Sequence, residues 1–116
     1  MTEARTYAWI FYATAASRNE DGATRGEIES VADGINHAFP TQKEMDESLK
    51  WAEAQNLIRS EGKTVFVTEG GSQLASQHTS QPGGVMKVWE RYTRAFEKMG
   101  ADNTVELDCR TMEPRR

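Results

Sequence analysis

The sequence predicts a small α+β domain that is mostly α-helical, and three observations carry this prediction. Two segments begin with a capping box, in which threonine is followed three residues later by glutamate: Thr24 with Glu27, and Thr41 with Glu44. Two short β-prone runs flank Ser60–Lys63 in the pattern of a hairpin. The chain has 116 residues and is 37% hydrophobic, which is enough for one core and one domain.

The first helix is expected over 6–17, TYAWIFYATAAS. Its four large apolar residues in a row, Trp9 to Tyr12, resemble a strand locally. The alanines that follow favour a helix instead, one that is buried around much of its circumference. The sequence RNEDG then ends it.

Two further helices are expected to begin at the capping threonines. After Thr24, one apolar face is formed by Ile28, Val31, Ala32 and Ile35. After Thr41, one face is shared by Met45, Leu49 and Ala52. Asn56 stands where this third helix would end in the left-handed conformation, which asparagine tolerates well.

The hairpin is expected to pair strands at about 57–59 and 64–67 across a four-residue loop, 60–63, in a sheet of two or three strands. The following EGGSQLASQ predicts at most a brief helical turn. The polar, Pro- and Gly-rich sequence around 79–84 has the composition of a linker.

The last helix is expected over 85–99. An apolar seam follows a heptad-like spacing of 4, 3, 4, 3 and comprises Val85, Trp89, Tyr92, Phe96 and Met99. A basic row lies on the opposite side: Lys87, Arg91, Arg94 and Lys98. The seam has to bury against the domain's first helix or against the same helix of a second subunit. We expect a homodimer, because a helix after the hairpin has little core left to cover.

Composition limits the classes of function. The net charge is −4 and the isoelectric point is about 5.2, which counts against bulk, non-specific affinity for nucleic acid. No apolar run approaches the ~20 residues of a membrane span, so no membrane partner is expected. The start of the chain has no secretory pattern. The single cysteine, Cys109, excludes an internal disulfide, so a cytoplasmic, reducing compartment is expected.

The segment LKWAEAQNLIRSEGKTVFVTEGGSQLAS carries a family resemblance. It resembles the winged helix-turn-helix pattern of Leu-x-x-Leu-Glu-x-x-Gly-Leu-Ile, a short turn, an apolar strand and Thr-x-x-Gly. Asn56 stands at the first glycine, and Thr68 and Gly71 form the final motif; Ala52 replaces a larger residue. The resemblance covers 6–76 and implies three helices plus a wing.

The domain organisation follows from this resemblance and from the composition. We expect a winged-helix domain over 1–78, a linker over 79–84 and a C-terminal dimerisation helix over 85–99. The tail, 100–116, has an alternation of Val105, Leu107 and Cys109 that fits an edge strand or a loosely ordered end.

The resemblance implies a homodimeric, DNA-binding transcriptional regulator of bacterial type, whose third helix enters the major groove. The DNA-facing candidates are Gln42, Lys43 and Lys50 on that helix and Lys63 at the wing tip. Asp46 and Glu47 on the same face are poor contacts for phosphate. The alternative is a winged-helix module that uses its acidic helix face to bind protein, not DNA.

Catalysis has little support in the sequence, and no enzyme, cofactor or metal site is expected. His37 and His78 have no carboxylate or cysteine at a recognisable spacing. Glu69-Gly70-Gly71 is not a phosphate loop, because no GxxxxGK[ST] sequence follows it.

Overall fold

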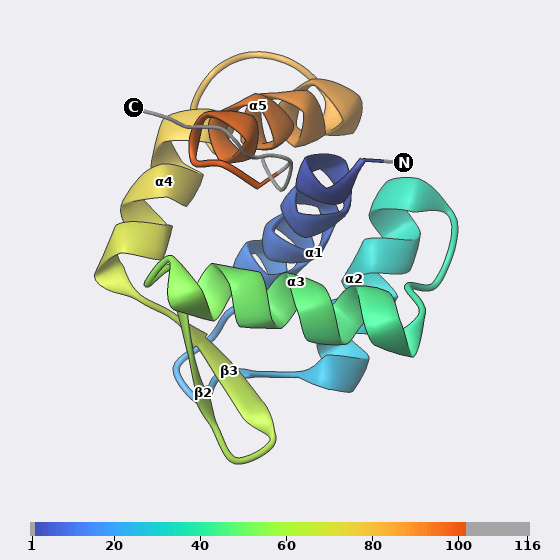
Figure 1. The fold of residues 1–116 in the computed structure, drawn as a ribbon, viewed down its shortest axis with the longest axis vertical. Helices are drawn as coiled ribbons and strands as arrows, with labels where there is room; N and C mark the ends of the chain where they lie inside the picture. The colour runs from blue at the N-terminus through green and yellow to red at the C-terminus, as the bar shows by residue number, and fades with distance from the viewer. Residues whose placement is uncertain (1, 102–116) are drawn as a thin grey trace, which may run out of the picture.

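The computed structural model describes residues 2–101 and shows an α+β fold that is mostly helical (Figure 1). The elements in chain order are α1 (Glu3–Ser17), β1 (Ala23–Thr24), α2 (Arg25–Asn36), α3 (Gln42–Ala54), β2 (Ile58–Glu61), β3 (Thr64–Val67), α4 (Glu69–Thr79) and α5 (Val85–Lys98). The three strands form an antiparallel sheet in the order β1-β3-β2. The predicted fold class is confirmed at this level.

Helix α1 is the centre of the molecule, and α2, α3 and α5 pack around it (Figure 1). Its buried residues point in most directions around the helix axis: Ala4, Ala8, Trp9, Ile10, Phe11, Ala13, Thr14 and Ala15. The prediction of a helix buried on much of its circumference is therefore confirmed. The helix begins three residues earlier than predicted, because the Thr2 hydroxyl accepts the Arg5 backbone N–H at 3.1 Å and caps it.

Both predicted capping boxes are present, and so is the left-handed residue after α3. At α2, the Thr24 hydroxyl accepts the Glu27 N–H at 3.2 Å, while the Glu27 carboxylate accepts the Thr24 N–H at 2.9 Å. Asn56 has a φ of 62° and turns the chain from α3 directly into β2. These local signals therefore set where α2 begins and where α3 ends.

The hairpin is tighter than predicted. Strands β2 and β3 pair from Ile58 with Val67 as far as Glu61 with Thr64, which leaves a turn of only Gly62 and Lys63. Gly62 has a φ of 62°, a conformation that glycine adopts without strain. The predicted four-residue loop is wrong because the two residues before the turn, Ser60 and Glu61, still pair in the sheet.

A junction built by Thr68 and Gly71 joins the end of α3 to the start of α4. The Thr68 hydroxyl donates to the Asn56 carbonyl at 2.6 Å and accepts the Gly71 N–H at 3.1 Å. A Cβ on Gly71 would lie 2.1 Å from the Leu57 carbonyl oxygen, so no side chain fits there. Gly71 therefore allows a close approach of two backbone segments.

Helix α5 packs along α1 of the same chain, and this corrects the predicted dimer seam. Trp89, Tyr92 and Phe96 are at most 1% exposed. The Trp89 indole N–H donates to the Arg5 carbonyl of α1 at 2.8 Å, and the Phe11 ring of α1 contacts the rings of Tyr92 and Phe96. These three residues therefore belong to the chain's own core, and not to a surface that a second subunit could cover.

The two ends of the seam remain at the surface. Val85 is 45% exposed and Met99 is 39% exposed, and Met86, next to Val85, is 54% exposed. Of the five residues predicted to form a dimer interface, Val85 and Met99 alone stay accessible to a partner.

Helix α4 is an 11-residue helix where the sequence predicted only a brief turn. Two glycines and several serines and glutamines weaken the helical signal, but Ala75 and Leu74 pack against the core. The linker predicted at 79–84 is reduced to the connection between Thr79 and Val85. Val105, Leu107 and Cys109 of the predicted tail lie outside the described residues.

Candidate nucleic-acid interface

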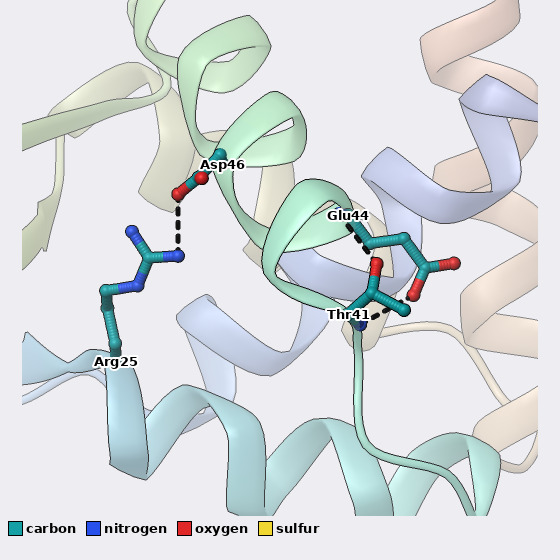
Figure 2. Close-up of polar contacts among 4 residues, drawn as sticks. All are labelled: Arg25, Thr41, Glu44 and Asp46. Carbon is teal, nitrogen blue, oxygen red and sulfur yellow. Dashed lines mark hydrogen bonds and ion pairs between the residues drawn. The ribbon is translucent and has the colours of Figure 1, made fainter.

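Helix α3 lies at the surface and presents one long side to solvent. Its N-terminus is closed by a second capping box (Figure 2): the Thr41 hydroxyl accepts the Glu44 N–H at 3.0 Å, and the Glu44 carboxylate accepts the Thr41 N–H at 2.9 Å. Met45, Ser48 and Ala52 face the core. The exposed side carries the predicted DNA-facing residues Gln42, Lys43 and Lys50 together with Asp46, Glu47 and Glu53.

Trp51 holds α3 against the body of the molecule. Its ring stacks on Tyr7 of α1 at 5.3 Å between centroids and contacts Phe96 of α5 at 4.7 Å. The neighbouring Ala52 faces the core and is 3% exposed. The two ring contacts of Trp51 therefore fix the orientation of α3 on α1 and α5.

Asp46, one of the two acidic residues that weakened the DNA prediction, is paired. The Arg25 guanidinium at the start of α2 donates to the Asp46 carboxylate at 2.7 Å (Figure 2). The Arg25 and Asp46 side chains are 40% and 58% exposed, so the pair lies at the surface and connects α2 to α3. Sequence reasoning missed Arg25, because the pair depends on how α2 and α3 lie relative to each other.

Lys43 lies in an acidic neighbourhood. It borders a cavity of about 230 Å³ between α1 and α3, together with Glu3, Glu44 and Glu47. Three carboxylates close to one ammonium group lower the positive potential there. Lys43 is therefore a weaker candidate for a phosphate contact than its place on the exposed side of α3 suggested.

The hairpin projects from the body below α3 and carries Lys63 in its turn (Figure 1). Arg59 on β2 pairs with Glu61 at 2.5 Å and lies over the Phe66 ring at 4.6 Å from its centroid. The Ser60 hydroxyl donates to the Glu53 carboxylate of α3 at 3.4 Å. The hairpin is thus tied to α3 through Ser60 of β2, and its turn bears one exposed cation, Lys63.

The charges of this surface balance. Arg25, α3 and the hairpin together supply five basic and five acidic side chains. Within residues 2–101, the ion pairs join Arg25 to Asp46, Arg59 to Glu61 and Arg94 to Glu90. The three predicted lysines, Lys43, Lys50 and Lys63, take part in none of them. Lys50 and Lys63 are consequently the cations of this surface best placed to meet an anionic partner.

Two of the four residues in the basic row on α5 already make other contacts. The Arg91 guanidinium donates to the carbonyls of His78 at 3.0 Å and Gln81 at 3.4 Å, and also to the Pro82 carbonyl. It therefore fixes the connection between α4 and α5. Arg94 pairs with Glu90 at 3.1 Å one turn away. Lys87 and Lys98 are the exposed cations left on this row.

The two histidines have different surroundings. His37 is exposed and ends α2 with a φ of 59°. His78 is partly buried on α4, and its ring lies 5.4 Å from that of Tyr92. Burial, with the nearby Arg91 charge, lowers the His78 pKa below its usual value, so the ring is neutral at pH 7. No group of three or more metal-binding side chains gathers among the described residues.

The chain was compared with known proteins, and it matches no protein-family model, no curated protein and no solved structure. In the part of the chain that is described, no helix is both long and apolar enough to cross a membrane.

Proposed function

We propose that the chain is a winged-helix DNA-binding protein, and that it acts as a transcriptional regulator. One observation carries the proposal: α3 presents an uncovered polar side, and the β2–β3 hairpin projects next to it. In this reading α2 and α3 are the helix-turn-helix and the hairpin is the wing. The family pattern around Asn56, Thr68 and Gly71 supports it, because these three residues form one junction between α3, β3 and α4.

The dimensions of α3 suit the major groove. An α-helix is about 10–12 Å across with its side chains and fits a groove about 12 Å wide, and the 13 residues of α3 make it about 20 Å long at ~1.5 Å per residue. Gln42 and Lys50 lie on its exposed side as readers of base edges or phosphate. Lys63 in the hairpin turn would then reach the backbone beside the groove.

The pairing of Asp46 with Arg25 also supports the proposal. It neutralises one of the carboxylates on the exposed side of α3. Glu47 and Glu53 remain there as local repulsions that specific contacts have to offset. We therefore expect weak binding that depends on few phosphate contacts.

Fluorescence anisotropy with a mixed pool of labelled duplexes tests the proposal. If the three predicted lysines, Lys43, Lys50 and Lys63, each neutralise one phosphate, duplex affinity should fall about 40-fold between 50 mM and 200 mM salt. The double variant Lys50→Gln, Lys63→Gln should reduce both the affinity and this salt dependence. Lys87→Gln, Lys98→Gln on α5 is the matched control and should change neither. Absence of binding at 50 mM salt, where electrostatic affinity is greatest, would refute the proposal.

A second candidate is a module of the same fold that binds a basic protein segment. It is favoured by the cavity between α1 and α3, which Glu3, Glu44 and Glu47 line together with Lys43. A basic peptide would bind more tightly to Lys43→Gln than to the wild type, whereas a duplex would bind less tightly. The sign of this change separates the two candidates.

We also propose that the chain forms a homodimer, through a smaller interface than the sequence predicted. Helix α5 would have to use Val85, Met86 and Met99, because the central seam residues are buried in the chain itself. Sedimentation of the wild type and of Val85→Glu, Met86→Glu tests this. A wild type that is already monomeric at about 0.1 mM would rule out the dimer. The DNA-binding proposal does not depend on this result.

A further inference from the structure

A groove between α4 and α5 combines apolar surface with positive charge, and it lies apart from the surface of α3 and the hairpin. Its volume is about 460 Å³. The residues along it include the apolar Leu74, Ala95 and Met99 and the basic Arg91, Arg94 and Lys98. None of the described residues that line it is acidic. The groove therefore suits an occupant that is both apolar and negatively charged.

The apolar surface of this groove is incompletely covered. Met99 is 39% exposed. Leu74 and Ala95 pack against the core but are only partly buried. Apolar side chains of an occupant would remove this surface from water, which is favourable in proportion to the area covered.

The cations of the groove retain donors for a carboxylate. Lys98 is exposed and takes part in none of the ion pairs of residues 2–101. Arg94 donates one N–H to Glu90, and a guanidinium has five. Arg91 is held by backbone carbonyls, but its charge remains. These three charges attract carboxylates to the groove.

The end of α5 directs the chain toward the body of the molecule beside this groove. The Gly100 N–H donates to the Glu97 carbonyl at 3.0 Å, and the Ala101 N–H donates to the Phe96 carbonyl at 3.0 Å. With a φ of 94° at Gly100, these bonds form a Schellman motif, which turns the chain off the helix axis. Ala101 is 3% exposed and stands two residues after Met99 of the groove. The next residues of the chain therefore start close to the groove.

The sequence of these next residues matches the groove. Segment 102–108, DNTVELD, has three carboxylates and no basic side chain. Val105 and Leu107 alternate with Glu106 and Asp108, so an extended backbone would place the apolar pair on one face and the two carboxylates on the other. Seven extended residues span up to about 23 Å at ~3.3 Å each. The seven steps along α5 from residue 91 to 98 cover about 10 Å at ~1.5 Å each, so the segment is long enough.

We infer that the groove between α4 and α5 is the docking site of the chain's own segment 102–108. Val105 and Leu107 cover the apolar surface of the groove, and the carboxylates pair with the exposed cations Arg94 and Lys98. The docked segment neutralises part of the basic row of α5. This contact is separate from α3 and the hairpin, so it does not depend on what that surface binds.

A methyl NOESY spectrum of the full chain tests the inference. At about 50 mM salt, where attraction between exposed charges is strong, we expect cross-peaks from the methyl groups of Val105 and Leu107 to those of Leu74 and Met99. An isotope-filtered spectrum of mixed labelled and unlabelled chains shows whether the contact is made within one chain. Absence of these cross-peaks, or cross-peaks between chains alone, would overturn the inference.

Charge variants of the full chain test the pairing. Glu106→Lys, Asp108→Lys turns two attractions into repulsions, so it should weaken docking at least about fivefold and reduce the cross-peaks accordingly. Adding Lys98→Glu to this double variant should restore part of their intensity. Glu113→Lys, which changes an acidic residue outside the segment, is the matched control and should keep the cross-peaks of the wild type. Undiminished cross-peaks in the double variant would contradict the pairing.

Discussion

The contact of α5 with α1 and the exposed side of α3 use their side chains in opposite ways. On α5, the three central aromatic residues of the heptad-like seam are buried in the chain's own core. On α3, the exposed side keeps a mixture of charges, and within residues 2–101 the one ion pair from this side to another element joins Asp46 to Arg25. The stronger sequence pattern, the apolar seam of α5, thus builds the core. The weaker one, the charged side of α3, remains available to a partner. An apolar seam predicts burial, but it does not predict which surface does the burying.

The largest expected effect tests the α5 side of this comparison. Trp89→Ala removes a fully buried ring and its hydrogen bond to the Arg5 carbonyl, so it should cost about 3–5 kcal/mol of unfolding free energy in urea denaturation. Val85→Ala, at the exposed end of the same seam, is the control and should cost less than about 1 kcal/mol. A folded Trp89→Ala that only changes its oligomeric state would show that the seam lies between subunits after all.

Gly71 and Gly70 give a matched test of the junction that positions the hairpin against α3. Gly71→Ala would place a Cβ 2.1 Å from the Leu57 carbonyl oxygen, so unfolding free energy should fall by about 2–3 kcal/mol. Gly70→Ala meets its nearest atom at an ordinary 3.6 Å and should be neutral or stabilising by up to about 1 kcal/mol. Chemical denaturation of both variants measures the difference. Equal stability of the two variants would mean that the backbone segments at Leu57 and Gly71 are not in close contact.

The pH dependence of stability tests the burial of Tyr92 on α5. The Tyr92 pKa is raised from its usual value to about 12 in the folded chain, so stability is complete below pH ~10 and is lost as pH rises from there toward 12. We expect a loss of about 2 kcal/mol over this interval. Tyr92→Phe should flatten the curve in denaturation experiments between pH 9 and 12. An unchanged alkaline loss in this variant would assign the effect to other groups.

The smallest expected effects concern the ion pair on the α3 side. Asp46→Asn frees Arg25 and removes a negative charge, so duplex affinity at low salt should rise about three- to tenfold. Arg25→Gln should lower it by a similar factor. Both variants should change stability by less than about 1 kcal/mol, because the pair is exposed. Glu90→Gln, which frees Arg94 on α5, is the control in the anisotropy measurement and should leave affinity unchanged.

The sequence predicted those features of the fold that depend on neighbouring residues. The capping boxes at Thr24 and Thr41, the left-handed Asn56 and the paired strands 58–61 and 64–67 follow from local chemistry. The length of α4 was missed, because its glycines and serines give a weak helical signal that packing by Ala75 overrides.

Features that depend on long-range contacts could not be predicted in the same way. The partner of the α5 seam lies some 80 residues away, as the bond from Trp89 to Arg5 shows. The Arg25–Asp46 pair likewise needs the relative placement of two helices. The positions of Gln42, Lys43, Lys50 and Lys63 on the surface followed from periodicity, but which of their charged neighbours are paired did not.

An NMR titration with duplex DNA at 50 mM salt tests directly whether α3 and the hairpin form a nucleic-acid interface. We predict that the perturbed amides lie in α3 and around Gly62 and Lys63, and that α5 is unaffected. Perturbations confined to the Lys87 and Lys98 side of α5, or none at all, would contradict it.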